Sequence, residues 1–225
     1  MKKTRYIIIA VAFICALSAV LSSCSKGNKF EIDGNKYVDK KTNISYIDAP
    51  ASYSPIGIED KVYGTFKELS LYAITGADPQ KWLCEKQGTV FYADGVSLPT
   101  LVQMNVSAVD IMLEDVSLVT VTDKAQISLF SAAYASASAN SYAKPLWSDD
   151  SIEINWRIRF KDESIGLYYT VAYIELKEDY VIESADGSEK NLGKKFFFNR
   201  YEGVFAPAGD VLDSYVEEYK EINEV

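Results

Sequence analysis

The segment from Ser151 to Phe160 places the strongest constraint on what this chain can fold into. Large apolar side chains alternate there with polar ones, at Ile152, Ile154, Trp156, Ile158 and Phe160. An unbroken period of two is typical of a β-strand with one buried face and one solvated face. After a turn, the run Leu167–Leu176 is mostly apolar on both faces, which predicts an interior strand paired with the first.

Shorter strand signals lie on both sides of this predicted hairpin. Between Phe30 and Ala49, β-prone runs alternate with turn residues, and Asp33-Gly34 predicts a tight hairpin turn. Strands are also predicted over residues 62–66, 69–74, 90–92, 109–113, 118–121 and within 194–205.

Three segments carry helix signals. Asp78 followed by Pro79 predicts a short helix through Trp82 and Leu83. Asp123 and Gln126 have the spacing of a capping box, which predicts a helix to about residue 139. The third helix is predicted after Asp210, where apolar residues recur at helical spacing, at Val211, Leu212, Tyr215, Val216 and Tyr219.

Runs of strands interrupted by a few helices, with short connections, are typical of the α+β class. We therefore predict an α+β fold in which two or three helices pack on a mainly antiparallel sheet. No Gly/Ser-rich linker marks an internal boundary, so residues 30–225 are predicted to form a single α+β domain.

The first 23 residues have the three parts of an export signal. A basic start precedes the mainly apolar run Ile7–Val20, and Leu21-Ser22-Ser23 leads directly into Cys24. This arrangement resembles the lipobox of bacterial lipoproteins. In that family a diacylglycerol is attached to the cysteine thiol, the signal is cut just before the cysteine, and the freed amine is often acylated as well.

The resemblance implies a division of the N-terminal region. Residues 1–23 would be the signal peptide, Cys24 the lipid attachment site, and residues 24–29 the lipidated N-terminus with a short linker. The protein would then be anchored by lipid to the cell membrane or an outer membrane and exposed outside the cytoplasm. Two alternatives stay open. The first is an uncleaved membrane helix over Tyr6 to Ser23, although this segment is shorter than the roughly 20 residues that a helix needs to cross a bilayer core. The second is plain secretion with loss of Cys24.

Charge and composition narrow the possible partners. Loss of residues 1–23 removes three basic and no acidic residues, which leaves 20 Lys and Arg against 32 Asp and Glu, a net charge of −12. Nucleic acid is therefore an unfavourable partner, and no phosphate-binding loop suggests a nucleotide. The chain has no histidine, which disfavours zinc sites and much proton-transfer chemistry. We expect neither cofactor nor metal, and we expect Cys84 to be an unreactive residue with partly buried apolar surroundings.

Glu153 and Glu175, on the two strands of the predicted hairpin, are the candidate acid pair for glycoside hydrolysis. Their placement depends on strand register. If Phe160 pairs with Leu167, the two side chains point to opposite faces, and a shift of one position sets them directly opposite each other. The alternative interpretation is that both are ordinary solvated acids.

Arg157 and Arg159 lie two positions apart on the solvated face of the first strand, and Tyr168 and Thr170 are their expected cross-strand neighbours. Arg157, Arg159 and Tyr168 are therefore candidates for a small anion-binding or glycan-binding patch. The alternative is local pairing of the arginines with Glu153 and neighbouring acids.

These observations favour a membrane-tethered bacterial lipoprotein with a non-catalytic binding or interaction domain, whose partner is an envelope protein or a glycan. The alternative is a glycan-directed envelope hydrolase that uses paired carboxylates. A binding module would expose an apolar or aromatic patch, whereas a hydrolase would hold two acids in one pocket. A third possibility, an assembly role, would leave a sheet edge open for pairing.

Overall fold

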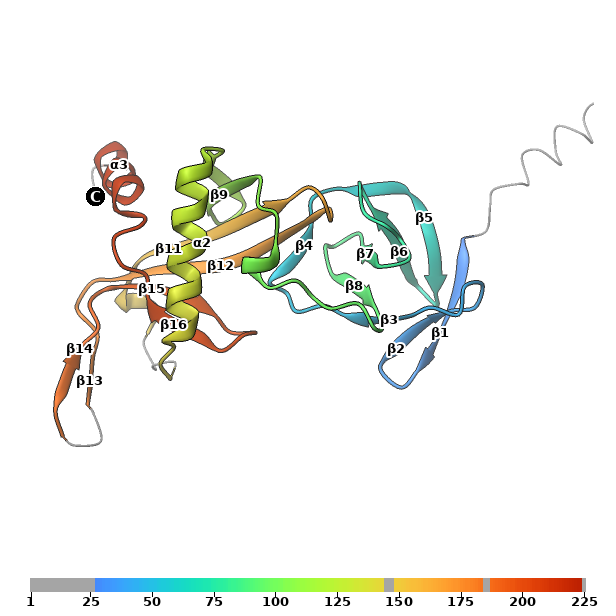
Figure 1. Cartoon of the computed structure of the whole chain (residues 1–225), viewed down its shortest axis with the longest axis horizontal. Helices are drawn as coiled ribbons and strands as arrows, with labels where there is room; N and C mark the ends of the chain where they lie inside the picture. Colours follow the sequence, from blue (N-terminus) through green and yellow to red (C-terminus); the bar gives the residue numbers. More distant parts are fainter. Residues whose placement is uncertain (1–26, 144–147, 184–186, 224–225) are drawn as a thin grey trace, which may run out of the picture.

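The computed structural model describes residues 27–143, 148–183 and 187–223. Cys24 and the export signal predicted from the sequence lie outside these residues. The described chain is elongated, with a closed barrel at one end and a larger sheet with two helices at the other (Figure 1). The first strand lies at the barrel end, and the C-terminal helix lies at the opposite end.

The barrel is built from seven strands in the order β1-β2-β3-β8-β7-β6-β5. Their bounds are β1 (Asn28–Asp33), β2 (Lys36–Asp39), β3 (Ser45–Asp48), β5 (Ile58–Phe66), β6 (Leu69–Ile74), β7 (Trp82–Glu85) and β8 (Val90–Ala93). Its interior is filled by a separate cluster of buried side chains that includes Phe30, Tyr46, Leu71, Leu83 and Phe91. The barrel was not predicted from the sequence.

A short parallel ladder between β1 and β5, with the pairs Asn28↔Gly64 and Lys29↔Thr65, closes the barrel. The other neighbouring barrel strands are antiparallel. A Cβ atom at position 64 would lie 2.7 Å from the carbonyl oxygen of Asn28 and would also meet the ring of Phe30. Glycine at position 64 therefore lets the two strands approach closely enough to close the barrel.

Two local predictions in this region have opposite outcomes. The Asp33-Gly34 turn is confirmed, since Asp33 pairs with Lys36 and Gly34 has a φ of +62°. The short helix predicted from Asp78 is wrong. The carbonyl of Asp78 accepts hydrogen bonds from the backbone of Lys81 and Trp82, but the chain then enters strand β7. Residues 82–84 are all buried there, and this burial between two barrel strands overrides the local capping signal.

The second sheet has the order β10-β9-β11-β12-β15-β16, and β4 pairs with one end of β12. The bounds are β4 (Tyr53–Pro55), β9 (Ala108–Leu113), β10 (Val116–Val121), β11 (Ile152–Asp162), β12 (Leu167–Leu176), β15 (Lys195–Asn199) and β16 (Val204–Pro207). A small separate hairpin is formed by β13 (Val181–Glu183) and β14 (Glu189–Asn191). Every strand pair of the second sheet is antiparallel.

The central hairpin of this sheet follows the sequence pattern closely. In β11 the even-numbered residues from Ile154 to Phe160 are buried, whereas Glu153, Asn155 and Arg157 are exposed. Strand β12 begins and ends at the predicted residues. The α+β class with mainly antiparallel strands is confirmed, but the single sheet predicted from the sequence is wrong, because the N-terminal strands close into a separate barrel.

Helix α2 (Lys124–Ala139) begins as predicted, with the Asp123 carboxylate accepting a hydrogen bond from the backbone of Gln126 at 3.0 Å. The predicted C-terminal helix begins later than expected, as α3 (Asp213–Asn223), because residues 210–213 form a turn. Two short 3₁₀ segments, η1 (Leu101–Gln103) and η2 (Asp149–Ser151), complete the described elements. None of the helices in the described residues is long and apolar enough to span a membrane.

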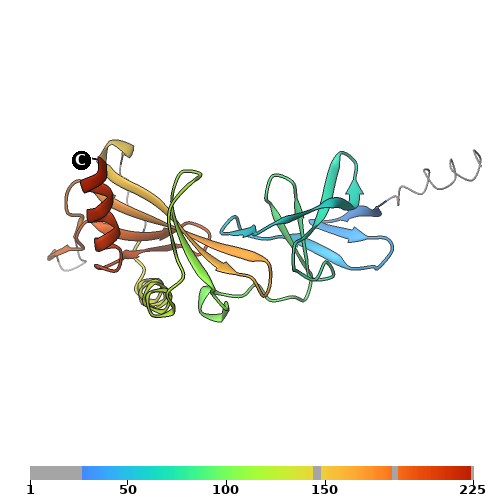
Figure 2. The ribbon, with the colours of Figure 1, turned by 90° about the horizontal axis from the view of Figure 1, so that it is seen from above.

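Both helices pack against the buried face of the second sheet. Tyr134 of α2 contacts the ring of Phe197, and Tyr219 of α3 contacts Trp156 at 5.5 Å between ring centroids. The same buried cluster extends into the barrel through Trp82 and Cys84. Barrel and sheet, which follow each other along the long axis in Figure 2, therefore share a hydrophobic core.

Cys84 is fully buried in this shared core, and burial raises the pKa of its thiol to about 12. A thiol with that pKa has almost no thiolate at neutral pH, so we expect no labelling of Cys84 by iodoacetamide in the folded protein. Labelling should appear in urea at the unfolding transition, measured by mass spectrometry of the Cys84 peptide. Rapid labelling under native conditions would contradict a closed junction between barrel and sheet.

Candidate functional site

The register of the central hairpin decides how Glu153 and Glu175 are placed. Phe160 pairs with Tyr169, so neither of the two registers considered from the sequence is present. In this ladder Glu175 pairs with Ile154, and the register shifts between Ile152 and Ile154. The two glutamates are therefore not direct cross-strand partners, and Glu153 lies at an irregular point of β11.

The two carboxylates nevertheless meet at Lys220 of α3. The Lys220 Nζ lies 2.9 Å from Oε1 of Glu153 and 3.0 Å from Oε1 of Glu175. Burial lowers the pKa of Lys220, but its hydrogen bonds and charge interactions with both glutamates outweigh burial, so this pKa lies above the ordinary value of 10.5. The ammonium group is charged and bridges the two acids. A glycosidase needs its two acids on either side of the substrate bond, whereas this pair holds a lysine.

Arg157, Arg159 and Tyr168 lie close together on the other face of the sheet. Arg159 is opposite Thr170 in the ladder, and its guanidinium stacks over the Tyr168 ring at 3.7 Å from the ring centroid. Arg157 forms an exposed ion pair with Asp115, at 3.0 Å. Local pairing is thus confirmed for Arg157, although its partner is Asp115 and not Glu153.

A polar cluster buried between α2 and the sheet was not expected from the sequence. The Tyr134 hydroxyl lies 3.2 Å from the Tyr169 hydroxyl and donates to Glu202 at 3.0 Å, and Asn199 donates to Tyr169 at 2.9 Å. Burial raises the pKa of both tyrosines, so both hydroxyls stay protonated. Tyr134, Tyr169 and Asn199 are buried and Glu202 is exposed at the border of the cluster. Because these groups satisfy one another, they stabilise the packing of α2 on the sheet.

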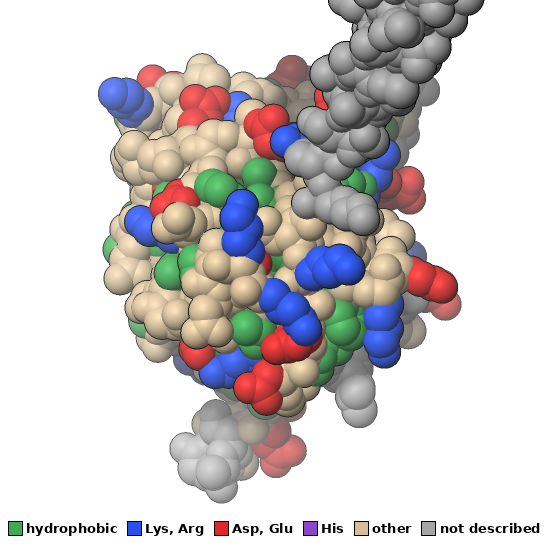
Figure 3. Space-filling view, turned by 90° about the vertical axis from the view of Figure 1, so that its right-hand side faces the viewer, with side chains coloured by type: hydrophobic (Ala, Val, Ile, Leu, Met, Phe, Trp, Pro, Cys, Tyr) green, Lys and Arg blue, Asp and Glu red, His purple; other side chains and the backbone are tan. Residues whose placement is uncertain are grey.

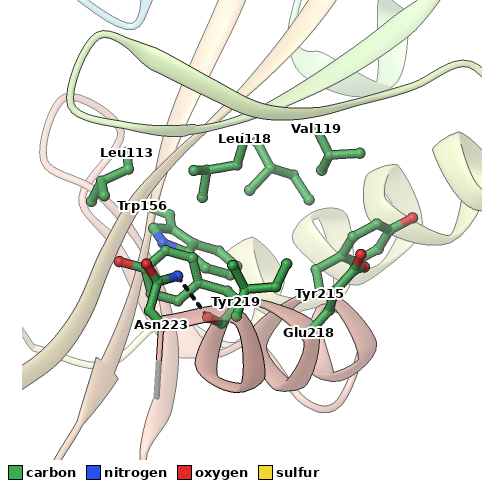
Figure 4. A pocket seen from close by; sticks show the side chains of 10 residues that line it. Leu113, Leu118, Val119, Trp156, Tyr215, Glu218, Tyr219 and Asn223 are labelled. Atoms are coloured by element: carbon green, nitrogen blue, oxygen red, sulfur yellow. Dashed lines mark hydrogen bonds between the residues drawn. The ribbon is translucent and has the colours of Figure 1, made fainter. Parts of the chain in front are cut away.

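An apolar hollow opens between the β9–β10 hairpin and α3 (Figure 4). It has a volume of about 440 Å³. Figure 4 shows Leu118 and Val119 on one side and Tyr215 and Glu218 across the opening from them, with Trp156 and Tyr219 packed together beside the opening. Its lining consists of Ile111, Leu113, Leu118, Val119, Trp156, Tyr215, Glu218, Tyr219, Ile222 and Asn223.

The hollow exists because α3 covers the sheet only in part. Tyr219 packs on Trp156 and Tyr215 packs on Phe130 of α2, which fixes the helix over β11. Large apolar side chains are left at the border, since Leu118 is 39% exposed and Ile222 is 72% exposed. The side of the hollow towards β10 is therefore apolar and open to solvent.

The charge around this opening is negative. Helix α3 carries Glu217, Glu218 and Glu221 on exposed positions, and Glu218 lines the hollow itself. Glu114 is exposed in the turn between β9 and β10, whereas Asp115 of the same turn pairs with Arg157 on the other face of the sheet. A ligand that enters between these elements passes acidic side chains, which favours a cationic partner.

Strand β10 forms one edge of the sheet, and of the described strands only β9 pairs with it. Its six residues, Val116–Val121, include no charged residue and no proline. The opposite edge is different, because the backbone of Tyr142 and the hydroxyl of Ser141 bond to Phe205 of β16. An uncharged and uncovered edge can accept an additional strand.

Sequence reasoning missed this hollow, although two signals for it are present. The run Val116–Val121 is β-prone and uncharged, which is unusual for a surface strand. Tyr215, Tyr219 and Ile222 continue a helical apolar stripe to the end of α3, beyond what the core covers. Neither signal could be interpreted without knowing that the two segments face each other.

Within the described ranges, no group of three or more Asp, Glu or Cys side chains is arranged to hold a metal ion. Comparison with protein-family models, with curated proteins and with solved structures finds no match to this chain. The candidate site is therefore argued from its own geometry.

Proposed function

We propose that this chain is a bacterial lipoprotein, anchored through Cys24, whose folded part binds a partner and catalyses no reaction. The sequence around Cys24 supports the anchor. The position of β1 supports its geometry, because β1 begins shortly after Cys24 at the end of the barrel farthest from α3 (Figure 1). The barrel would then lie next to the membrane, and the sheet with its hollow would point away from it.

The surface at the barrel end supports attachment by lipid and not by charge. Figure 3 shows Lys and Arg side chains interspersed with Asp and Glu on this end. Two of the lysines form ion pairs there, Lys36 with Asp94 at 2.5 Å and Lys40 with Glu31 at 2.6 Å. Paired charges attract an anionic membrane only weakly, whereas two or three acyl chains give a stable anchor.

The observation that carries the binding function is the apolar hollow beside the open edge of β10. A segment added to that edge would form backbone hydrogen bonds with β10. Every second side chain of the segment would point to the face on which α3 lies, where the hollow can take large apolar groups. The acidic residues around the opening favour lysine or arginine in the ligand, on either side of its apolar side chains. We therefore propose an extended protein segment of apolar and basic residues as the ligand.

The binding site can be tested by selecting displayed random peptides on the full-length protein in detergent micelles. We expect selected peptides to alternate apolar residues and to carry Lys or Arg. Leu118→Lys should weaken their binding at least about tenfold, since it places a cation at the opening, against a basic ligand. Leu129→Lys is the matched control, because Leu129 is 55% exposed on α2, outside the hollow, and should leave binding unchanged. If the selected peptides bind equally well to Leu118→Lys and Leu129→Lys, the hollow is not their binding site.

Strand addition makes a separate prediction about the ligand backbone. Methylation of peptide amides on the side that faces β10 should abolish binding, because each methyl group removes a donor of the added ladder. Methylation at the intervening positions should have a much smaller effect. A uniform response along the peptide, measured by fluorescence anisotropy, would exclude pairing with β10.

The anchor has its own test, which does not depend on the ligand. The mature protein should begin at Cys24, with the mass of a diacylglyceryl group on its thiol, in mass spectrometry of the N-terminal peptide. An unmodified Cys24, or a chain that begins at a later residue, would contradict the lipoprotein assignment.

A further inference from the structure

A second hollow lies on the other face of the sheet, where the barrel meets it. It has a volume of about 540 Å³ and lies between the β7–β8 turn of the barrel and the solvated face of β11. Three cations, Lys86, Arg157 and Arg159, line this groove, and Asp115 is the only acid among the residues that line it. Because Arg157 and Arg159 alternate with Trp156 and Ile158, the groove and the apolar hollow lie on opposite faces of β11.

Arg159 is the key side chain of the groove, because it is half-buried and lacks a carboxylate partner. Among the described residues no carboxylate oxygen lies within 4.0 Å of its guanidinium. Asp110 is its ladder partner on β9, but the Asp110 carboxylate accepts a hydrogen bond from the Thr120 hydroxyl at 2.6 Å. Within the described parts of the chain, the guanidinium donates only to the sulfur of Met112, at 3.3 Å, and a thioether is a weak acceptor.

The guanidinium is also held in position. Its central carbon lies 3.7 Å from the centroid of the Tyr168 ring, which is on the neighbouring strand β12. Stacking fixes the plane of the guanidinium and leaves those edge N–H groups that do not donate to Met112 available to a ligand. A preorganised cation with unused donors, in a chain that is otherwise strongly acidic, is suited to bidentate recognition of an oxyanion.

The two other cations surround this position. Lys86 is exposed on the β7–β8 turn, and no described carboxylate lies within 4.0 Å of it. Arg157 is paired with Asp115, whose side chain is 97% exposed, so this ion pair contributes little and can be exchanged for a ligand. Thr170 adds a hydroxyl beside Arg159.

We propose that this groove is a binding site for an oxyanion, a carboxylate or phosphate group on a small ligand, with Arg159 as its principal contact. Lys86 and Arg157 raise the local positive potential, and Thr170 supplies a neutral hydrogen bond. This site is separate from the proposed peptide site, and neither depends on the other.

Three sugars of the same ring size test the proposal: glucose 6-phosphate, glucuronate and uncharged glucose. Binding is measured by saturation-transfer NMR on the full-length protein in detergent micelles, with saturation of the aromatic protein resonances. We expect a signal from at least one charged sugar and none from glucose, and we expect that signal to weaken as salt is added. A response to glucose 6-phosphate alone would identify phosphate as the preferred group, and a response to glucuronate alone would identify carboxylate.

Variants connect the signal to the groove. Arg159→Gln should weaken binding of the charged sugar at least about tenfold. Arg200→Gln is the matched control, because Arg200 also stacks on a tyrosine, 5.4 Å from the Tyr201 ring centroid, but does not line the groove. Asp115→Asn should strengthen binding about threefold, since it releases Arg157 from its ion pair.

Three outcomes would overturn the proposal. These are equal signals from all three sugars, no signal from either charged sugar, and a signal that Arg159→Gln and Arg200→Gln change to the same extent. Leu118→Lys should leave anion binding unchanged, so failure of this site and failure of the peptide site are distinguishable.

Discussion

Replacement of Lys220 by methionine is expected to lower the free energy of unfolding by about 2 to 3 kcal/mol, near the lower end of values for broken buried ion pairs. The side chain of Glu175 is only 8% exposed, and its Oε1 lies 3.0 Å from Lys220. Its Oε2 has no hydrogen-bond partner among the described residues. Without Lys220, the buried carboxylate would lose this cationic partner. Urea unfolding followed by circular dichroism measures the change.

A double variant separates this effect from simple loss of packing. In Lys220→Met/Glu175→Gln no charge is left buried, so we expect much of the lost stability to return. Glu153→Gln should have a smaller effect than Lys220→Met, because the side chain of Glu153 is 30% exposed. If the double variant is as unstable as Lys220→Met, the unpaired buried charge of Glu175 does not cause the loss of stability.

The same ion pair predicts a dependence on pH. The pKa of Lys220 in the folded state is raised above 10.5, so its stabilising contribution is fully present below that pH. The contribution is lost as the pH rises through the folded-state pKa. The difference in stability between the wild type and Lys220→Met should therefore narrow above pH 10.5, and a difference that widens there would contradict this account.

Gly64→Ala is expected to lower the free energy of unfolding by about 2 to 3 kcal/mol, the upper range for overpacked positions. The added Cβ would lie 2.7 Å from the carbonyl oxygen of Asn28 and would meet the ring of Phe30. Since the backbone of β1 is one of these contacts, β1 must move away from β5 and open the barrel. Hydrogen exchange should show loss of protection in β1 before any other strand.

Gly57→Ala is the matched control for this variant. A Cβ at position 57 would meet only the side chain of Thr75, at 3.1 Å, and a side chain can adjust more easily than backbone. We expect a loss of less than about 1 kcal/mol from Gly57→Ala. Equal losses from the two variants, or uniform loss of protection, would show that close approach at Gly64 does not determine closure.

Local patterns predicted the parts of the fold that depend on neighbouring residues. Alternation along β11 identified its two faces, and Asp123 with Gln126 identified the start of α2. The barrel could not be predicted in the same way, because its closure depends on pairing between β1 and β5, which are distant in sequence. The helix signal at Asp78 was wrong for a similar reason, since long-range burial of β7 outweighed it.

The candidate site also depends on contacts that local sequence patterns could not predict. The register of the hairpin was wrong because Asp162, a polar residue expected in the turn, is buried as the last residue of β11. Its carboxylate accepts a hydrogen bond from the backbone of Ser164 at 2.9 Å, which moves the turn along the chain. Relative to the register in which Phe160 pairs with Leu167, the error was two positions, so the faces of Arg159 and Thr170 were still correct in that register. The other register considered was wrong by one position. The meeting of Glu153 and Glu175 at Lys220 depends on a helix distant in sequence.

If the protein is anchored by lipid, as proposed, the irregularity in β10 affects how neighbouring copies on one membrane can meet. The register of β10 against β9 shifts between Ser117 and Val119. Such a bulge increases local twist, so two copies brought side by side on one bilayer would present edges that diverge after a few residues. Anchored neighbours would therefore not pair along their β10 edges even at high density, whereas the proposed flexible ligand segment could still follow the twisted edge.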